Sequence, residues 1–463
     1  MVVPSSRATA TDIAGANDEG DRMRVGVIGV GHVGLVTAAA LAELGHTVMA
    51  MDLDMVKIAL LCSGKSPFYE PGLDELIARP TGAGRLDFLS ESAEAVPNAD
   101  VVFICVGRPT TAAGDASLTA VEAVGREVAR HATPGVVVAE KSTVPPGTAD
   151  RLRLTIAREC PGLAFSVVAN PEFLREGHAV RDTLQPDRIV VGSDDGLGFE
   201  AMRELYRPLI ERGIPLIETD VRTAELAKLA SNAFLATKIS FANALARVAE
   251  LTGADIVRIA EVMGADPRIG SAFLRAGLGF GGYCLPKDTQ TLERIAERAG
   301  YDFGLLREAV RVNEEAVTAV AAKVEEAVWN LEGKRIAFLG LAFKVGTDDV
   351  RCAPALTLAR RFAEEGAVVV GHDPMAAAEA RAAFPDMEIA SDAYEAVTSA
   401  HCIVICTEWP EYRELDLDRV RRLAAYPILV DGRNVLDPDR AELAGLTYLP
   451  VGRPVRRREG ARD

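Results

Sequence analysis

The chain has 463 residues, 49% of them hydrophobic and 25% charged, and a formal net charge of −16 at pH 7. This length is sufficient for two or three domains, each with its own hydrophobic core. The acidic balance argues against nucleic acid or an anionic membrane as the main partner, because both require a basic surface. It is compatible with a phosphorylated substrate, since phosphate sites are built locally from Arg, Lys and helix N-termini.

The seven cysteines are scattered along the chain, and no two of them form a C-x-x-C pair. This pattern supports neither a zinc site nor the disulfide framework of a secreted protein, so we predict reduced thiols, no bound metal and a cytoplasmic location. Residues 1–22 lack the apolar core of a signal peptide, and no apolar run reaches the roughly 18 residues that span a bilayer. We expect residues 1–22 and the basic residues 453–462 to be flexible.

Short apolar runs rich in β-branched residues alternate with helix-length segments from Arg24 to about residue 218. Runs of this kind are typical of parallel strands that helices bury on both faces. The pattern predicts an α/β domain over residues 23–218 with a parallel sheet. The predicted strand segments are 24–31, 46–52, 100–107, 135–143, 165–173, 187–193 and 214–220.

The first predicted strand ends in a glycine-rich turn, in which Gly29, Gly31 and Gly34 are spaced as G-x-G-x-x-G, and Asp52 ends the next strand. The first glycine permits a tight bend, the second lets the backbone approach a pyrophosphate, and the third packs the helix on the sheet. An acid about 20 residues further on binds the adenosine ribose and repels a 2′-phosphate. The segment therefore predicts an NAD site. The motif alone leaves two alternatives open, FAD and a glycine-rich turn without a dinucleotide.

Residues 225–251 contain neither Pro nor Gly, and small and apolar side chains dominate. They predict one long helix, about 40 Å at 1.5 Å per residue, whose alanines and serines allow another helix to approach closely. Helical sequence continues to about residue 330, with a glycine-rich break at 277–282. We assign residues 219–332 to a central helical domain.

Strand-like runs return after this helical region and predict a second, smaller doubly wound domain over residues 333–463. The expected fold is therefore α/β, with two doubly wound Rossmann-like domains joined by a long central helix and a helical region. The predicted strand segments of the second domain are 334–343, 367–374, 402–409 and 427–435.

Residues 277–288 read GLGFGGYCLPKD and contain the most distinctive cysteine of the chain. The glycines remove side chains where the backbone must lie against a ligand. Lys287 and Asp288 follow Cys284 within one helical turn, and a nearby ammonium group is expected to depress the pKa of the thiol. The other six cysteines are interpreted as small hydrophobic side chains.

This segment resembles the G-F-G-G-x-C-x-P-K-D signature of the UDP-glucose/GDP-mannose dehydrogenase family, and the similarity extends from about residue 23 to about 440. The resemblance implies a four-electron oxidation of a nucleotide-sugar CH2OH to a carboxylate, with NAD as cofactor. A cysteine would hold the intermediate as a thiohemiacetal and then as a thioester, so that no free aldehyde is lost. The other matching segments are 70–76, 140–148, 170–177, 186–192, 227–234, 343–351 and 431–435.

The resemblance assigns roles to matching residues. Cys284 matches the nucleophile, and Glu172 the acid/base residue of thioester hydrolysis. Lys228 and Asn232 lie four residues apart on one helix face and match the pair that stabilises the oxyanion. Asp288 matches a carboxylate that orders a water and Lys228. Further catalytic and cofactor contacts match Lys57, Thr143, Glu176, Lys287 and Arg351. Groups around the sugar nucleotide match Glu172, Phe173, Leu174, Lys228, Asn232, Arg268, Phe280, Gly281, Phe343, Lys344 and Arg433.

The chain departs from the commonest family pattern at three positions near these motifs: Arg108, Tyr283 and Leu285. The GFGG spelling and Lys287 favour UDP-glucose, giving UDP-glucuronate, whereas GDP-mannose and other UDP-hexoses are the alternatives. A simple β-hydroxyacid dehydrogenase would need neither Cys284 nor a third domain. A regulator that binds NAD or a nucleotide sugar without catalysis is the alternative from another class. The resemblance also implies at least a homodimer, joined through residues 225–251, in which Arg268 reaches the partner's sugar site.

Overall fold

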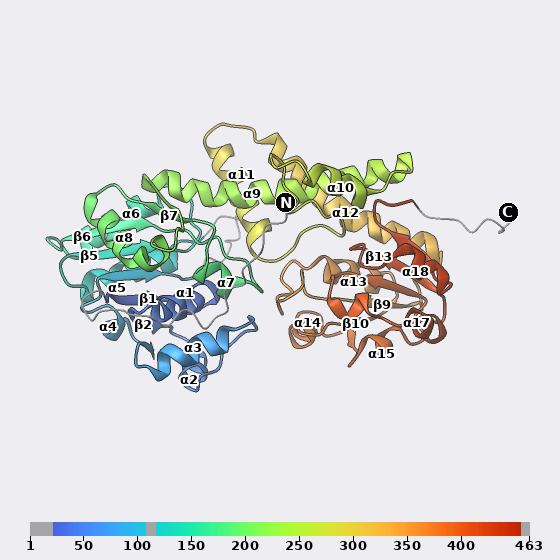
Figure 1. The fold of residues 1–463 in the computed structure, drawn as a ribbon, viewed down its shortest axis with the longest axis horizontal. Coiled ribbons are helices and arrows are strands. Elements are labelled where there is room, and N and C mark those ends of the chain that lie inside the picture. The colour runs from blue at the N-terminus through green and yellow to red at the C-terminus, as the bar shows by residue number, and fades with distance from the viewer. Residues whose placement is uncertain (1–21, 108–116, 455–463) are drawn as a thin grey trace, which may run out of the picture.

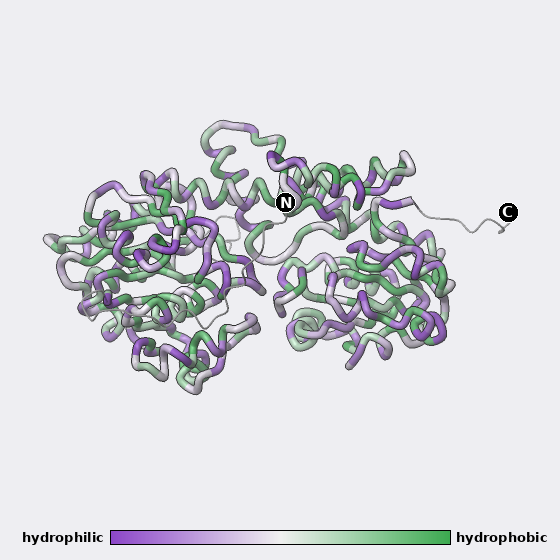
Figure 2. Tube along the Cα trace, in the orientation of Figure 1, coloured by the Kyte–Doolittle hydropathy of each residue, from purple (hydrophilic) through white to green (hydrophobic). Residues whose placement is uncertain are grey.

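The computed structural model describes residues 22–107 and 117–454. The terminal segments that we expect to be flexible lie almost entirely outside these ranges, and Arg108 lies outside them as well. The described chain forms two lobes of mixed helices and strands, and a layer of long helices crosses from one lobe to the other (Figure 1). Hydrophobic stretches run through the interior of both lobes (Figure 2).

The N-terminal lobe is built on an eight-stranded sheet in the order β3-β2-β1-β4-β5-β6-β7-β8, and β1 to β6 run parallel. Separate hydrophobic clusters cover the two faces of this sheet, which explains why its strands consist of continuous runs of apolar residues. Its strands are β1 (Arg24–Ile28), β2 (Thr47–Met51), β3 (Leu86–Leu89), β4 (Val101–Ile104), β5 (Val136–Glu140), β6 (Phe165–Ala169), β7 (Ile189–Gly192) and β8 (Leu216–Thr219). Its helices are α1 (His32–Glu43), α2 (Met55–Cys62), α3 (Leu73–Gly82), α4 (Ser92–Ala95), α5 (Thr119–His131), α6 (Thr148–Glu159), α7 (Ala179–Leu184) and α8 (Gly196–Ile210).

The prediction of a wholly parallel sheet is wrong for its last two strands. β7 pairs with β6 in the antiparallel sense, and β8 is parallel to β7. A parallel neighbour requires the chain to cross back to the opposite edge of the sheet. Residues 170–188 instead stay at the carboxyl edge, where β6 ends and β7 begins. This path places Glu172 and Glu176 over that edge, where ligands bind in sheets of this class.

The long central helix α9 spans Val221–Thr252 and therefore begins four residues before its predicted start. The Asp220 side chain accepts a hydrogen bond from the Thr223 backbone and caps the first turn, and Gly253, with φ +73°, ends the helix. α9 packs against the helices that follow it and spans both lobes (Figure 1). These helices are α10 (Ile256–Gly264), α11 (Cys284–Arg298) and α12 (Gly304–Val328).

The C-terminal lobe contains a six-stranded parallel sheet in the order β11-β10-β9-β12-β13-β14. Its connectivity repeats that of β1 to β6, so the predicted fold class of two doubly wound domains joined by a central helix is confirmed. The division at residues 218/219 and 332/333 stays a prediction. The strands are β9 (Arg335–Leu339), β10 (Val368–His372), β11 (Glu388–Ile389), β12 (Cys402–Ile405), β13 (Ile428–Asp431) and β14 (Thr447–Pro450). The helices are α13 (Pro354–Glu364), α14 (Ala377–Ala383), α15 (Ala393–Val397), α16 (Pro410–Arg413), α17 (Leu417–Leu423) and α18 (Pro438–Leu443).

Both ends of α9 are tied to a lobe. At its start, Gly192 of β7 lies so close that an added Cβ would stand 2.6 Å from the Ala224 side chain. At its end, the Glu250 carboxylate accepts a hydrogen bond from the Gly452 backbone at 2.9 Å and pairs with Lys323 at 2.8 Å. The helix α9 therefore connects the two lobes through contacts at both of its ends.

Candidate active site

The glycine-rich turn after β1 has the shape that a dinucleotide site requires. Gly29 adopts φ +95°, and a Cβ there would stand 2.8 Å from the Cys105 carbonyl oxygen. A Cβ at Gly34 would collide with the Gly29 carbonyl, so this glycine is needed for α1 to pack on the turn. At Gly31, no atom of the described chain lies within 4 Å of an added Cβ. That open side lies at the N-terminus of α1, where backbone N–H groups favour a phosphate.

Asp52 follows β2 and lies beside the same turn. Its Oδ2 accepts hydrogen bonds from the Val30 backbone at 3.0 Å and from Lys57 Nζ at 2.9 Å, and its Oδ1 accepts one from the Asp54 backbone. Burial disfavours the carboxylate, but these hydrogen bonds outweigh it and hold the pKa of Asp52 below its usual value. An ionised acceptor at this position fits the ribose hydroxyls of NAD.

The segment after β6 is anchored by an acid to which sequence reasoning gave no role. Buried Glu70 accepts hydrogen bonds from the Gly177 backbone at 2.7 Å and from the Ala179 backbone at 2.8 Å, and it lies 3.0 Å from His32 Nε2. Its position in the matching segment 70–76 was the only signal available. By fixing the end of the 170–177 loop, Glu70 defines where Glu176 can lie.

Two residues of α9 face this loop and α11. Lys228 Nζ lies 3.0 Å from Glu172 Oε1, and Asn232 Nδ2 donates a hydrogen bond to Asp288 Oδ2 at 2.7 Å. Lys228 is only 3% exposed and Glu172 8%. Burial disfavours the ammonium, but the carboxylates of Glu172 and Asp288 outweigh it and raise the pKa of Lys228. The structure thus brings together the two residues that helical spacing places on one face.

Cys284 is the first residue of α11, and its side chain is accessible to solvent, although protein surrounds the thiol on most sides. That burial, together with the carboxylates of Glu172 and Asp288, raises the pKa of Cys284 to about 12, against the opposing effect of Lys228 and Lys287. The expected depression of this pKa is therefore wrong. The distant carboxylate of Glu172, which the local sequence does not reveal, contributes to the difference.

The glycines before Cys284 serve packing between domains. A Cβ at Gly281 would collide with the Cys352 carbonyl, and one at Gly282 would stand 2.9 Å from the Phe343 ring. The Gly282 backbone donates a hydrogen bond to the Arg351 carbonyl at 2.9 Å. At both positions the C-terminal lobe occupies the space that a side chain would need, and contact of this backbone with a ligand stays a prediction.

The central helices hold the other side of this segment. Asn243 of α9 accepts a hydrogen bond from the Gly277 backbone at 2.8 Å. The Asn313 amide of α12 accepts one from the Phe280 backbone at 2.7 Å and donates one to the Phe280 carbonyl at 3.1 Å. Neither asparagine was singled out from the sequence, because the amides lie in otherwise ordinary helical segments.

Residues 343–351 of the C-terminal lobe reach the N-terminal lobe directly. The Tyr69 backbone donates a hydrogen bond to Asp348 Oδ2 at 3.1 Å, and a Cβ at Gly177 would stand 2.6 Å from the Gly346 carbonyl oxygen. Arg351 lies 3.6 Å from Glu176. Burial lowers the pKa of Lys344, although Glu176 and other carboxylates oppose this. The three parts of the chain therefore meet around Cys284.

The remaining predicted residues lie in different surroundings. Phe173 lies beneath Lys228, whose Nζ is 5.2 Å from the ring centroid, and the Leu174 backbone donates a hydrogen bond to Glu172 Oε2 at 2.8 Å. Arg433 donates to the Cys406 carbonyl at 2.9 Å and packs beside the glycine segment. Arg268 stands apart from the cluster: its side chain is 88% exposed and pairs with Asp266 at 2.6 Å.

Thr143 is half-buried in the loop between β5 and α6. Buried Glu225 of α9 holds the end of this loop, since its carboxylate accepts hydrogen bonds from the Gly147 backbone at 2.6 Å and the Ala149 backbone at 2.9 Å. Sequence reasoning missed this residue, because one acid near the start of a long helix is an unremarkable feature. Glu225 ties the Thr143 loop to the helix that carries Lys228.

Two doubly wound domains that meet around an accessible thiol, beside a turn shaped for a dinucleotide, are typical of an NAD-dependent dehydrogenase. The chain belongs to the UDP-glucose/GDP-mannose dehydrogenase family. The family's NAD binding domain matches residues 23–210, its central domain residues 222–315 and its UDP binding domain residues 337–438. The resemblance, the NAD cofactor and a nucleotide-sugar substrate are thereby confirmed. A simple β-hydroxyacid dehydrogenase does not account for the third domain.

Individual relatives match over most of their length. The chain is 44% identical to a UDP-glucose 6-dehydrogenase of Rhizobium meliloti (strain 1021), over 93% of this chain and 100% of the relative. It is 42% identical to UDP-glucose 6-dehydrogenase YwqF of Bacillus subtilis (strain 168), over 93% and 98%. Among solved structures, it is similar to a UDP-glucose dehydrogenase from the hyperthermophilic archaeon Pyrobaculum islandicum, with a TM-score of 0.89, 39% identity and coverage of 95% and 100%.

The described residues contain neither a helix that could span a membrane nor a group of side chains that could hold a metal ion. Within residues 22–107 and 117–454, no helix is both long and apolar enough to cross a bilayer. In the same part of the chain, His, Cys, Asp and Glu side chains do not gather in threes in a way that could hold a metal ion.

Proposed function

We propose that the protein oxidises UDP-glucose to UDP-glucuronate, using two NAD and one water per sugar, through a thioester on Cys284. The observation that carries the proposal is the convergence of the Cys284 thiol with Lys228, Asn232, Glu172 and Asp288 where the two lobes meet. The UDP-glucose named in the relatives and in the solved structure supports the choice of substrate.

The first residues to act are those that bind and orient the sugar CH2OH. NAD, when bound, accepts the two hydrides that the reaction removes, and the alcohol proton is released to solvent with the first of them. Lys228 Nζ and the Asn232 amide act as donors toward the sugar C6 oxygen, and each such donor typically lowers a barrier by roughly 3–4 kcal/mol. Because Lys228 keeps its charge despite burial, it remains a strong donor throughout.

Cys284 then captures the aldehyde. Because burial and the neighbouring carboxylates keep the Cys284 thiol protonated, sulfur forms a bond to C6 while the thiol proton passes to the former carbonyl oxygen. In the second oxidation, C6 loses its hydrogen as hydride to NAD and the hydroxyl proton is released to solvent, which leaves a thioester on Cys284. Lys228 and Asn232 face the same oxygen in both steps.

Glu172 is positioned for the last step, the hydrolysis of the thioester. Its carboxylate takes a proton from water, whose oxygen attacks the thioester carbon. As the C–S bond breaks, Glu172 returns this proton to the departing sulfur, which restores the thiol. General-base assistance of this kind is usually worth about 10²–10⁴-fold. The ion pair with Lys228 and the hydrogen bond from the Leu174 backbone keep Glu172 in place.

The test of the substrate is NADH formation, followed by absorbance, with UDP-glucose, UDP-galactose, UDP-N-acetylmannosamine and GDP-mannose at fixed NAD. We expect the highest kcat/KM with UDP-glucose and two NADH per sugar. A tenfold preference for another sugar refutes the substrate, whereas one NADH per sugar refutes the four-electron chemistry. No turnover of any nucleotide sugar would leave the alternative of a regulator without catalysis.

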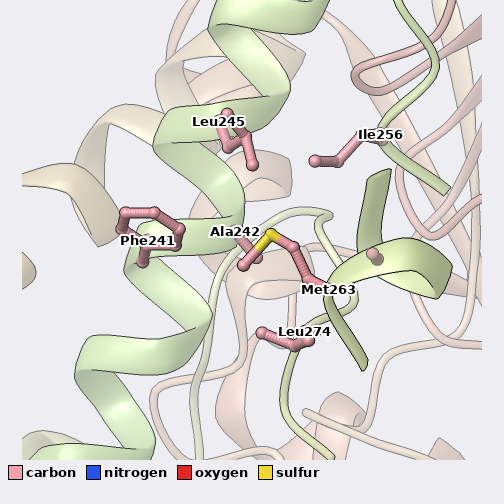
Figure 3. Close-up of a pocket in the computed structure, with 7 residues that line it drawn as sticks. Phe241, Ala242, Leu245, Ile256, Met263 and Leu274 are labelled. Atoms are coloured by element: carbon pink, nitrogen blue, oxygen red, sulfur yellow. The ribbon is translucent and has the colours of Figure 1, made fainter. Parts of the chain in front are cut away.

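We also infer a homodimer formed through α9. Phe234, Phe241 and Val248 recur every seven residues on this helix and are 66%, 56% and 52% exposed, so one face presents an apolar stripe. Beside it, α9 and α10 enclose an apolar recess lined by Leu245 and Met263 (Figure 3). A second copy of the same stripe is the partner that this face fits, and exposed Arg268 is then free to reach the partner's sugar site.

Light scattering tests the dimer. The unaltered protein should have twice the mass of one chain, and Phe241→Glu should halve it, because the new charge would be buried in the interface. Leu443→Glu is the matched control, since Leu443 is 86% exposed on α18 in the C-terminal lobe and should leave the dimer intact. A monomer with full activity would refute the inference.

The seven free thiols support a cytoplasmic location, which is likewise a proposal.

A further inference from the structure

Tyr283, one of the positions at which this chain departs from the commonest family pattern, lies where two cations meet. It immediately precedes Cys284 and stands at the N-terminus of α11. Lys287 Nζ lies over the Tyr283 ring, 4.5 Å from its centroid, and the Arg351 guanidinium carbon lies over the same ring at 4.7 Å. Both distances are within the roughly 6 Å at which a cation gains from the negative face of an aromatic ring.

The two cations come from different parts of the molecule. Lys287 lies one helical turn after Tyr283 on α11, whereas Arg351 belongs to the C-terminal lobe. Two positive charges at one ring repel each other, and each therefore needs compensation. Lys287 lies 3.5 Å from Asp288, and the Arg351 side chain donates three hydrogen bonds to the Asp349 carboxylate, at 2.9, 3.0 and 2.6 Å.

We propose that Tyr283 is a positioning residue that holds Lys287 and Arg351 in place for the anionic cofactor. The ring stabilises each cation, so it holds them close together before the negative charge of the dinucleotide arrives. Because Arg351 is contributed by the C-terminal lobe, the ring also links the placement of that lobe to the shape of the cofactor site. This inference rests on the proposed function and on the family resemblance, which matches Lys287 and Arg351 to contacts of the cofactor.

The side chain at this position decides whether the arrangement can form. A serine, the residue frequent at this position in the family pattern, has no ring and cannot hold either cation in this way. Without the ring, Lys287 would still have Asp288 at 3.5 Å, and Arg351 would still have Asp349 at 2.6 Å. These carboxylates are acceptors that compete with the cofactor for the same cations. Loss of the ring is therefore expected to weaken cofactor binding more than sugar binding.

The test compares Tyr283→Leu with Tyr283→Phe. Leucine keeps an apolar side chain and removes the ring, and we expect it to raise the KM for NAD about tenfold while the KM for UDP-glucose changes less than twofold. Phenylalanine keeps the ring and should restore the KM for NAD to within about twofold. Tyr301→Leu is the control, because Tyr301 is 62% exposed between α11 and α12, away from both cations.

NADH titration, followed by the fluorescence of the reduced nicotinamide, measures binding without turnover. We expect Tyr283→Leu to weaken NADH binding about tenfold and Tyr283→Phe to leave it nearly unchanged. Equal losses in the two variants would assign the effect to the hydroxyl and overturn the proposal, as would equal changes in both KM values. If no sugar is oxidised but Tyr283→Leu weakens NADH binding, the proposed function fails and the role of Tyr283 stands. If turnover is as proposed but NADH binding is unchanged, Tyr283 has no such role.

Discussion

The raised pKa of Cys284 leads to a prediction about the reactivity of its thiol. At pH 8, a thiol with a pKa of about 12 is ionised in roughly one molecule in ten thousand, whereas a free cysteine with a pKa of about 8.5 is ionised in roughly one in four. Solvent reaches the Cys284 side chain and screens the neighbouring charges. The expected difference in reactivity between the two thiols is therefore about a hundredfold. Iodoacetamide should therefore alkylate Cys284 about a hundredfold more slowly than the exposed Cys62.

Two variants test the physical cause of this slow reaction. Glu172→Gln and Asp288→Asn each remove a carboxylate that raises the pKa of Cys284, and each should speed alkylation by about tenfold. Peptide mass spectrometry of timed samples at pH 8 gives the rates, and Cys62 in the same molecule is the internal control. Alkylation of Cys284 as fast as that of Cys62, or equal rates in the variants and the unaltered protein, would refute the reasoning.

Three further predictions concern stability and the cofactor. Lys228→Met leaves the Glu172 carboxylate buried without its partner and should lower the free energy of unfolding by about 3–5 kcal/mol. Adding Glu172→Gln should recover part of this loss. Equal thermal midpoints in the single and double variants would contradict this prediction. Burial raises the pKa of Glu225 to about 7, above that in the unfolded chain, so its contribution to stability is present below about pH 4.5 and is lost as the pH rises through 7. Glu225→Gln should flatten this part of the curve of thermal midpoint against pH, and an unchanged curve would show that Glu225 does not titrate there. Asp52 should make kcat/KM for NAD exceed that for NADP by roughly a hundredfold or more, and comparable values would refute its role.

The parts of the site that the sequence predicted are those set by local spacing. Gly29, Gly31 and Gly34 belong to one turn. Asp52, which follows the next strand, lies beside this turn and accepts a hydrogen bond from it. Lys228 and Asn232 face the same side of α9 because four residues make about one helical turn. Such relations hold wherever the element itself forms.

The parts that the sequence did not predict depend on the path of the chain through space. The direction of β7 follows from the edge at which the chain re-enters the sheet, and no residue of β7 specifies it. The pKa of Cys284 depends on Glu172, which lies far away in the sequence and is brought near by the 170–177 loop. Glu70 and Glu225 act only because distant backbone N–H groups come to lie at their carboxylates.

The short strands form a third group. β11 is only two residues long, and β14 contains a proline at its end, so neither shows the apolar run by which the other strands of the second domain were predicted. Both lie at the edges of their sheet and are positioned by their neighbours. They affect the outline of the C-terminal lobe without changing its connectivity around the site.

Intact-mass spectrometry of Glu172→Gln, incubated with UDP-glucose and NAD, tests the covalent role of Cys284 most directly. Without the carboxylate that activates water, the thioester should accumulate and add the mass of the oxidised nucleotide sugar to the protein, and peptide mapping should place it on Cys284. Cys284→Ala with Glu172→Gln is the control and should show no added mass. Full production of UDP-glucuronate by Cys284→Ala alone, or an added mass on another residue, would contradict the account.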